Sequence, residues 1–270
     1  MSAGEGLPEG IDPDKASVAR MYDAMLGGHH NFAIDREALA AFTAIDPQVR
    51  TLARANRAFL GRAVRFLLDA GVRQFIDLGS GIPTQGNVHE VAQSASPGAR
   101  VVYVDNDPVA VAHSAALLAD NPDADIVNAD IRRPADVLSA PQVGKLIDFD
   151  QPVAVLMITI LHFIAPEENP AGIVTAFRDA LPGESWLAMT HATNQDRPET
   201  AAAVGQLYRS RASSPVTARS REEILGLFDG FDLAEPGLTY VPLWRPDPDD
   251  EIPDDPSEYW VYAGVGRKTP

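Results

Sequence analysis

Several features that the sequence lacks exclude whole classes of function. The 270 residues include no cysteine, which rules out disulfides, thiolate nucleophiles and cysteine-ligated metals. No apolar run reaches the roughly 20 residues of a membrane span, and the first residues lack the apolar core of a signal peptide. We therefore expect a cytoplasmic protein that makes no membrane contact.

Positive charge is scarce as well. There are 22 Lys and Arg against 38 Asp and Glu, which gives a net charge of −16 and an isoelectric point near 4.6. Nucleic acids and anionic membranes are bound mainly by basic side chains that neutralise phosphate. The composition therefore predicts a small-molecule substrate and no nucleic-acid partner, while the oligomeric state stays open.

The most informative stretch is FIDLGSGIPTQGNV, residues 75–88. An apolar strand is predicted to end in a turn formed by Gly79, Ser80 and Gly81, and a helix with Thr84 as its N-cap follows. A strand, a glycine turn and a helix leave backbone N–H groups facing an open crevice. This pattern indicates a cofactor site, with an ordinary βα connection as the alternative.

The turn favours one cofactor over another. Dinucleotide folds use Gly-x-Gly-x-x-Gly or Ala, whereas here the third position is Thr84 and Pro83 removes an N–H donor. Asp77 adds negative charge, which repels a diphosphate and suits a cation. S-adenosylmethionine carries a sulfonium and an ammonium group, so the turn favours it over a nicotinamide dinucleotide.

A second predicted strand, residues 101–105, ends in an acid. Asp105 lies about 25 residues beyond the glycine turn, where a carboxylate can accept both ribose hydroxyls of a nucleoside. Asn106 follows, and then Asp107 and Pro108 are expected to cap and begin the next helix. Asp105 alone could equally be a turn residue.

A third predicted strand, residues 124–129, is followed by Asp130. Its carboxylate can accept from an adenine amine, while the backbone N–H of Ile131 donates to a ring nitrogen. Capping or turn formation is again the alternative for Asp130. Three successive strand ends with suitable groups favour the cofactor interpretation.

The residues before the first strand are expected to form a separate helical unit. We predict a lid over residues 1–71 and a cofactor-binding domain over residues 72–270. Residues 1–10 are expected to be disordered, and Asp12-Pro13 to cap and begin the first helix. Asp35 is expected to cap a second helix, residues 36–45, before a long third helix over residues 48–70.

The first helix ends in an unusual polar cluster. Arg20 could form a bidentate pair with a ligand carboxylate, and Tyr22 and Asn31 lie close to it in the sequence. A C-capped helix followed by a surface loop explains the same residues. His29 and His30 are adjacent and point apart, so no metal site is predicted. The series Arg50, Arg54 and Arg57 is interpreted as a solvated helix face in preference to an anion site.

The acceptor side of the crevice is predicted from the later strands. Residues 151–164 are the most apolar run in the chain, with a central strand over 153–159. His162 follows this strand, and His191 follows the next one, residues 185–190. His162, His191 and Tyr22 are therefore candidates for catalytic contacts with an acceptor, with packing as the alternative.

The last two predicted strands, residues 238–243 and 258–266, have no helix between them. They should form an antiparallel hairpin at the edge of the sheet. The expected fold is α/β and Rossmann-like, with a seven-stranded, mostly parallel sheet, an antiparallel edge hairpin and an N-terminal helical lid.

Three phrases of the sequence resemble a known family. They are ARMYDAMLGGHHNFAIDR (19–36), DLGSGIPT (77–84) and NVHEVA (87–92). With the order of predicted strands, they resemble class I S-adenosylmethionine-dependent methyltransferases. More narrowly, they are similar to the actinobacterial S-adenosyl methyltransferase family formerly called a domain of unknown function. The likeness covers nearly the whole chain and implies S-adenosylmethionine as cofactor, but it does not identify the acceptor. It implies a pocket at Gly79, Ser80, Gly81, Asp105, Asn106, Asp130 and Ile131, closed by Arg20, Tyr22 and Asn31.

Two other functions stay open at this point. A non-catalytic S-adenosylmethionine sensor would bind the cofactor without transferring a methyl group. A nicotinamide-dependent reductase would bind a dinucleotide and needs Thr84 at the position of a small residue. A methyltransferase acting on a small molecule is favoured, because displacement at a sulfonium methyl depends on positioning and water exclusion and needs no visible catalytic triad.

Overall fold

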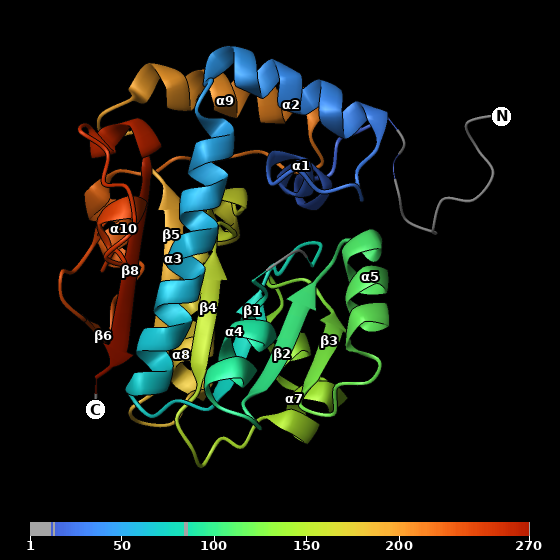
Figure 1. Ribbon diagram of the computed structural model, residues 1–270, viewed down its shortest axis with the longest axis vertical. Helices are drawn as coiled ribbons and strands as arrows, with labels where there is room; N and C mark the ends of the chain where they lie inside the picture. The colour runs from blue at the N-terminus through green and yellow to red at the C-terminus, as the bar shows by residue number, and fades with distance from the viewer. Residues whose placement is uncertain (1–11, 13, 84–85, 270) are drawn as a thin grey trace, which may run out of the picture.

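The fold is built around a mostly parallel sheet. The computed structural model describes residue 12, residues 14–83 and residues 86–269 (Figure 1). Over these residues the sheet has eight strands in the order β3-β2-β1-β4-β5-β8-β6, and β7 pairs with β8. The strands are β1 (Gln74–Leu78), β2 (Arg100–Asp105), β3 (Ala124–Asn128), β4 (Ala154–Ile158), β5 (Trp186–Ala192), β6 (Phe231–Leu233), β7 (Thr239–Tyr240) and β8 (Val261–Lys268).

The five strands β1 to β5 run parallel, and β8 runs antiparallel to its neighbours. Strands β1, β2 and β4 are almost wholly buried, because parallel sheets are covered on both faces. Side chains alternate between the two faces, so that Phe75 packs in one apolar cluster while Ile76 and Leu78 pack in the other. The predicted α/β, Rossmann-like fold is confirmed.

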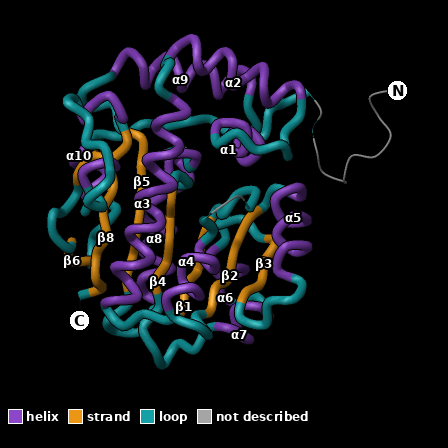
Figure 2. Tube along the Cα trace, in the orientation of Figure 1, coloured by secondary structure: helices purple, strands orange, loops and turns teal. Residues whose placement is uncertain are grey.

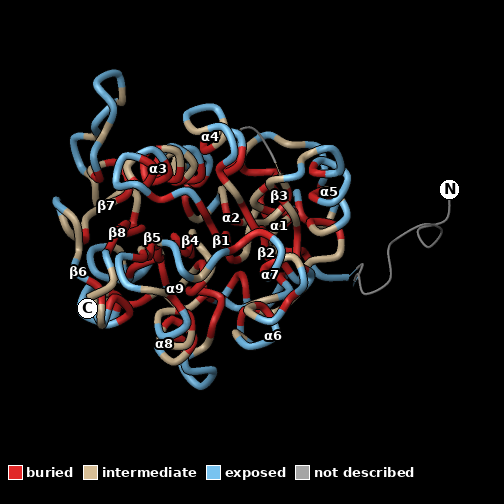
Figure 3. The backbone as a smooth tube through the Cα atoms, turned by 90° about the horizontal axis from the view of Figure 1, so that it is seen from below, coloured by how far each residue is buried: buried red, intermediate tan, exposed pale blue. Residues whose placement is uncertain are grey.

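Helices cover both faces of this sheet. Figure 3 shows α3 and α4 on one side of the strands and α6 and α8 on the other. None of the described helices is long and apolar enough to cross a membrane. The α-helices are α1 (Val18–Met25), α2 (Ala33–Ile45), α3 (Val49–Asp69), α4 (Val88–Ala95), α5 (Pro108–Leu118), α6 (Pro134–Leu138), α7 (Pro141–Leu146), α8 (Pro170–Ala180), α9 (Pro198–Arg211) and α10 (Arg221–Gly226). Four short 3-10 turns among the described residues are η1 (Leu161–Phe163), η2 (Pro166–Glu168), η3 (Val241–Leu243) and η4 (Pro256–Tyr259).

Three helices, α1, α2 and α9, lie beyond the carboxyl ends of the parallel strands (Figure 2). They share an apolar cluster that includes Phe42, Tyr208 and Trp260. The lid predicted from the N-terminal residues therefore has an additional helix from the second half of the chain. Helix α3 belongs to both parts, since its second half, with Leu67, packs on the sheet. The division into two domains at residue 71 stays a prediction.

The first helix begins later than predicted. Helix α1 starts at Val18 with Ser17 as its N-cap, so the prediction of a start at Asp12-Pro13 is wrong; Pro13 itself lies outside the described residues, as do residues 1–10. The physical reason is tertiary pairing. The backbone N–H of Ala16 donates to the carbonyl of Arg211 at 3.0 Å, which holds this segment against the end of α9.

Two other predicted caps are corrected. Helix α2 begins at Ala33, and Asp35 lies inside its first turn, where its carboxylate accepts from the backbone N–H of Phe32 at 2.7 Å. An acid three residues into a helix satisfies the N-terminal amides in this way. Helix α4 has Asn87 as its N-cap in place of Thr84, which lies outside the described residues.

The C-terminal strands form a broader arrangement than a simple hairpin. Strand β7 does pair antiparallel with β8, with Thr239 opposite Ala263. Strand β8, however, lies between β5 and β6, and β6 was not predicted because it has only three residues. His191 lies within β5, opposite Tyr262, instead of following the strand.

Candidate functional site

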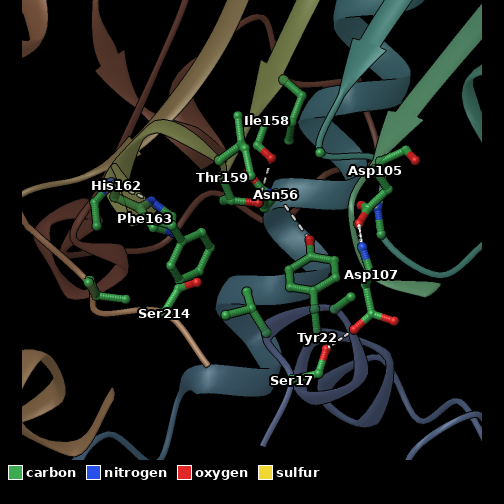
Figure 4. Close-up of a pocket in the computed structure, with 18 of the residues that line it drawn as sticks. Ser17, Tyr22, Asn56, Asp105, Asp107, Ile158, Thr159, His162, Phe163 and Ser214 are labelled. Atoms are coloured by element: carbon green, nitrogen blue, oxygen red, sulfur yellow. Dashed lines mark hydrogen bonds between the residues drawn. The ribbon is translucent and has the colours of Figure 1, made fainter. Parts of the chain in front are cut away.

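A cavity lies where the parallel strands end beneath α1, α2 and α9. In Figure 4, Tyr22 and Asn56 separate Asp105 and Asp107 on one side from Phe163 and Ser214 on the other. We refer to the two sides as the charged half and the apolar half. The charged half is lined by Asp77, Asp105, Asp107, Asp130, Arg57 and Arg132. The apolar half is lined by Met25, Phe42, Phe163, Val204, Tyr208 and Trp260.

Asp105 links the ends of β1 and β2. One carboxylate oxygen accepts from the backbone N–H of Gly81 at 2.7 Å and the other from that of Asp107 at 2.8 Å. Burial raises the pKa of Asp105 to about 6, and these backbone hydrogen bonds act in the opposite direction. Gly81 has a φ of +68°, a conformation that favours glycine. The turn after β1 and the acid at the end of β2 are therefore one structural unit.

Asp77 is the second buried carboxylate of the charged half. Burial raises its pKa to about 7, with Arg57 lowering it and Asp105 raising it further. No described residue donates a hydrogen bond to Asp77, although its side chain lines the cavity. A carboxylate in this position gains from a cation within the cavity.

The loop after β3 completes this side. Asp130 accepts from the backbone N–H of Arg132 at 3.0 Å, and it also forms an ion pair with the Arg132 guanidinium at 3.0 Å. Arg132 also contacts Glu168 at 2.9 Å, which ties this loop to η2. Asp130 and Ile131 both line the cavity, as do Gly79, Ser80 and Asn106. The Ser80 hydroxyl is buried without a hydrogen-bond partner among the described residues.

Arg20 and Asn31 do not line the cavity. The Arg20 guanidinium is buried against Asp35 at 2.7 Å and Asp107 at 3.8 Å, so the predicted fork is occupied by carboxylates of the protein. Asn31 donates to Asp23 at 2.8 Å. The structure therefore does not place these two side chains where the predicted direct contact with a ligand would need them. Arg20 instead connects α1 to the segment that follows Asp105.

Arg57 was interpreted from its spacing as part of a solvated helix face in preference to an anion site, but the structure places it at the cavity. It lines the charged half, lies 6.0 Å from the centre of the Tyr22 ring, and makes no hydrogen bond or ion pair with any other described residue. Arg50, by contrast, donates to the Ala24 carbonyl at 2.8 Å, and Arg54 is exposed. The sequence could have indicated this position, because Arg57 lies four residues after the buried Ala53 and therefore on the same face of the helix.

Tyr22 lines the cavity at the border between the two halves. Its hydroxyl donates to the Ala53 carbonyl at 3.2 Å and accepts from the Asn56 amide at 2.9 Å. Asn56 in turn accepts from the Thr190 hydroxyl at 2.8 Å. Burial raises the pKa of Tyr22. The phenol is therefore neutral and held in place, which does not suit a general base.

The two candidate histidines have different environments. His162 lines the cavity, whereas His191 is fully buried beneath it and is not part of its wall. The Nδ1 of His191 donates to the Ala192 carbonyl at 2.7 Å, and its Nε2 accepts from Arg219 at 2.7 Å. Burial and the nearby guanidinium lower the pKa of His191 to about 3. The structure therefore does not bring His191 to the cavity at which its catalytic contact was predicted.

His162 presents a donor to the cavity. Its Nδ1 accepts from the backbone N–H of Ala192 at 3.4 Å, and burial holds its pKa well below the ordinary value. The neutral ring therefore carries its proton on Nε2. No described residue pairs with this nitrogen.

Comparison with other proteins agrees with this geometry. A candidate methyltransferase from Thermobifida fusca YX is 41% identical over 100% of both chains, with a TM-score of 0.91. A DUF574 family protein from Streptomyces avermitilis MA-4680 is 39% identical over 96% of this chain and 99% of that one, with a TM-score of 0.91.

More distant structures show the fold alone. The N-methyltransferase NodS from Bradyrhizobium japonicum WM9, in complex with S-adenosyl-L-homocysteine, is 10% identical over 93% of this chain and 100% of that one, with a TM-score of 0.51. Among curated proteins, none matches this chain. The family model of S-adenosyl methyltransferases matches residues 5–269, and the chain belongs to that family.

Proposed function

We propose that this chain binds S-adenosylmethionine in the charged half of the cavity and transfers its methyl group to a small molecule in the apolar half. The observation that carries the proposal is the convergence of Asp77, Asp105 and Asp130, from three successive strand ends, on one cavity. Open α/β sheets bind ligands at this edge. Membership of the S-adenosyl methyltransferase family supports the same cofactor.

The charged half suits this ligand better than a dinucleotide. Three carboxylates would repel a diphosphate, whereas they favour a sulfonium, an ammonium group and the hydroxyls of a ribose. Asp105 retains free lone pairs for the ribose, since each of its oxygens accepts one protein hydrogen bond. Asp130 and the backbone N–H of Ile131 are assigned to the adenine edge.

The amino-acid part of the cofactor is assigned to Asp77 and Arg57. Asp77 would attract the cationic groups, and Arg57 would pair with the carboxylate as a charge-assisted hydrogen-bond donor. This replaces Arg20, whose guanidinium is already paired. Gly79, Ser80 and Gly81 shape the turn between these groups.

Catalysis would depend on positioning. Bound S-adenosylmethionine supplies a methyl group on a sulfonium, which is already a good leaving group. Helices α1, α2 and α9 place apolar residues over the strand ends, and these residues would exclude water from the site. Tyr22 lies at the border between the two halves, where donor and acceptor would meet, and His162 would donate to the acceptor. Orientation of this kind can supply several kcal/mol of a reaction barrier.

Titration calorimetry with S-adenosylmethionine, S-adenosylhomocysteine and NADH tests the cofactor. The first two are expected to bind and NADH is not; binding of NADH alone would support a reductase. Transfer of a labelled methyl group from S-adenosylmethionine into small-molecule extracts then tests catalysis. Cofactor binding without transfer into any extract fraction would indicate a sensor.

A further inference from the structure

The apolar half has a preformed aromatic wall. The rings of Phe163 and Tyr208 lie 5.9 Å apart at 35°, and Phe42 meets Tyr208 edge-on at 5.8 Å. Trp260 adds a further ring 6.3 Å from Phe42. These four residues come from η1, α9, α2 and the segment before β8. Flat carbon surfaces held by one another favour a flat ligand.

Charge is confined to the other half of the cavity. Every Asp and Arg among the described lining residues belongs to the charged half, and no Glu or Lys lines the cavity within the part that the structure describes. The titratable groups of the apolar half are neutral, because burial lowers the pKa of His162 and raises that of Tyr208. A charged ligand would lose hydration here without gaining a counter-ion.

Two buried residues of the apolar half each present a polar side-chain atom that has no hydrogen-bond partner among the described residues. His162 is 7% exposed and Tyr208 is 5% exposed, and both line the cavity. Neither the Nε2 of His162 nor the hydroxyl of Tyr208 forms a hydrogen bond with a described residue. Both atoms carry hydrogens in the neutral state, so each can donate. Donors in the wall of a largely buried cavity are suited to pair with an acceptor atom of a ligand.

From these observations we propose that the methyl acceptor is an uncharged, largely apolar ring compound bearing a carbonyl or hydroxyl oxygen that accepts from His162 and Tyr208. This inference rests on the proposed methyltransferase function, because that function makes the bound ring compound the methyl acceptor. The binding of such a compound can nevertheless be tested by itself. A metabolite with a phosphate, carboxylate or ammonium group within the ring portion would not fit this half.

Naphthalene and three of its derivatives test the proposal on the full chain. They are 2-acetylnaphthalene, 2-naphthoate, 2-naphthylmethylammonium and naphthalene, measured by calorimetry or tryptophan fluorescence with and without saturating S-adenosylhomocysteine. We expect 2-acetylnaphthalene to bind at least tenfold more tightly than either ion and severalfold more tightly than naphthalene. Binding of 2-naphthoate at least as tight as that of the ketone, or no binding of any of the four, would overturn the assignment.

A matched pair of variants locates the oxygen. Tyr208→Phe keeps the ring and removes the hydroxyl donor. We therefore expect the affinity for 2-acetylnaphthalene to fall about fivefold and the affinity for naphthalene to stay unchanged. Tyr240→Phe makes the same substitution outside the cavity and should change neither. Equal losses for both ligands in Tyr208→Phe would contradict the assigned hydrogen bond.

The two proposals fail in different ways. If S-adenosylhomocysteine binds but the neutral ring does not, only the acceptor assignment is wrong. If the neutral ring binds but S-adenosylhomocysteine does not, the methyltransferase proposal fails while the ring site stands.

Discussion

The charged half and the apolar half of the cavity are constructed in opposite ways. In the charged half, Asp105 and Asp130 lie at strand ends and accept from backbone N–H groups two residues further along the chain, and Asp105 also accepts from Gly81 in the turn after the neighbouring strand β1. In the apolar half, Phe42, Tyr208 and Trp260 come from distant parts of the chain and orient one another by ring contacts. The first half thus depends on the turns at the ends of neighbouring strands, and the second depends on packing between distant helices.

This difference predicts how each half responds to substitution. Hydrogen bonds to charged groups are strong and directional, so single changes in the charged half should be costly for the cofactor. Dispersion contacts in the apolar half are many and individually weak. The following predictions test that contrast, beginning with the largest effect.

Asp105→Asn should have the largest effect on cofactor affinity. The backbone N–H groups of Gly81 and Asp107 both donate to the carboxylate. In the variant the NH₂ group of the amide would face one of these N–H groups, so that two donors would meet. We expect S-adenosylhomocysteine to bind less tightly by about 2 to 3 kcal/mol, or roughly 30- to 150-fold. Calorimetry measures this, with the exposed Asp120→Asn as the matched control. A loss of S-adenosylhomocysteine affinity below threefold would show that Asp105 does not bind the ribose.

Arg57→Met should weaken S-adenosylhomocysteine binding by roughly 10- to 30-fold through loss of one charge-assisted hydrogen bond. Methylthioadenosine, which lacks the amino-acid part, should bind the variant and the unmodified chain equally. Arg54→Met removes an exposed arginine from the same helix and serves as the control. If methylthioadenosine loses as much affinity as S-adenosylhomocysteine, Arg57 does not contact the carboxylate.

The pH dependence of binding tests Asp77. Its pKa is raised to about 7, so the carboxyl becomes protonated as the pH falls through 7 and loses its attraction for a cation. The affinity for S-adenosylmethionine should therefore fall by up to about tenfold between pH 8 and pH 6. S-adenosylhomocysteine, whose sulfur is uncharged, should show a weaker dependence.

Asp77→Asn is the control for this titration. The variant should bind more weakly at pH 8 and lose most of the dependence on pH, and the remainder near pH 6 is expected from Asp105, whose pKa burial raises to about 6. An affinity that stays constant in the unmodified chain, or that rises toward pH 6, would contradict the role given to this carboxylate.

Tyr22→Phe should have the smallest effect on ligands. The hydroxyl contacts only Ala53 and Asn56 among the described residues, and the Asn56 amide would lose a partner. We expect S-adenosylhomocysteine affinity to stay within about threefold, and the free energy of unfolding to fall by about 1 to 2 kcal/mol. Chemical denaturation and calorimetry on the same samples give both values. A hundredfold loss of methyl transfer with affinity retained would restore Tyr22 as a base.

The same contrast explains what the sequence could predict. Apolar strands, the glycine turn and the cap of α5 are local patterns, and the fold, the α5 cap at Asp107 and the convergence of the strand-end acids followed from them. The fates of Arg20 and His191 depend on Asp35 and Arg219, partners that no local spacing reveals. Likewise, the aromatic wall requires knowing that α2 and α9 are neighbours.

Asp107 caps α5 by accepting from the N–H groups of Val109 and Ala110, and it also accepts from the Ser17 hydroxyl and faces Arg20. Its backbone N–H is held by Asp105. Any outward swing of α1 must therefore break contacts to the residue next to the proposed ribose site. The Asp107 side chain therefore couples the position of α1 to the access of a nucleoside to Asp105.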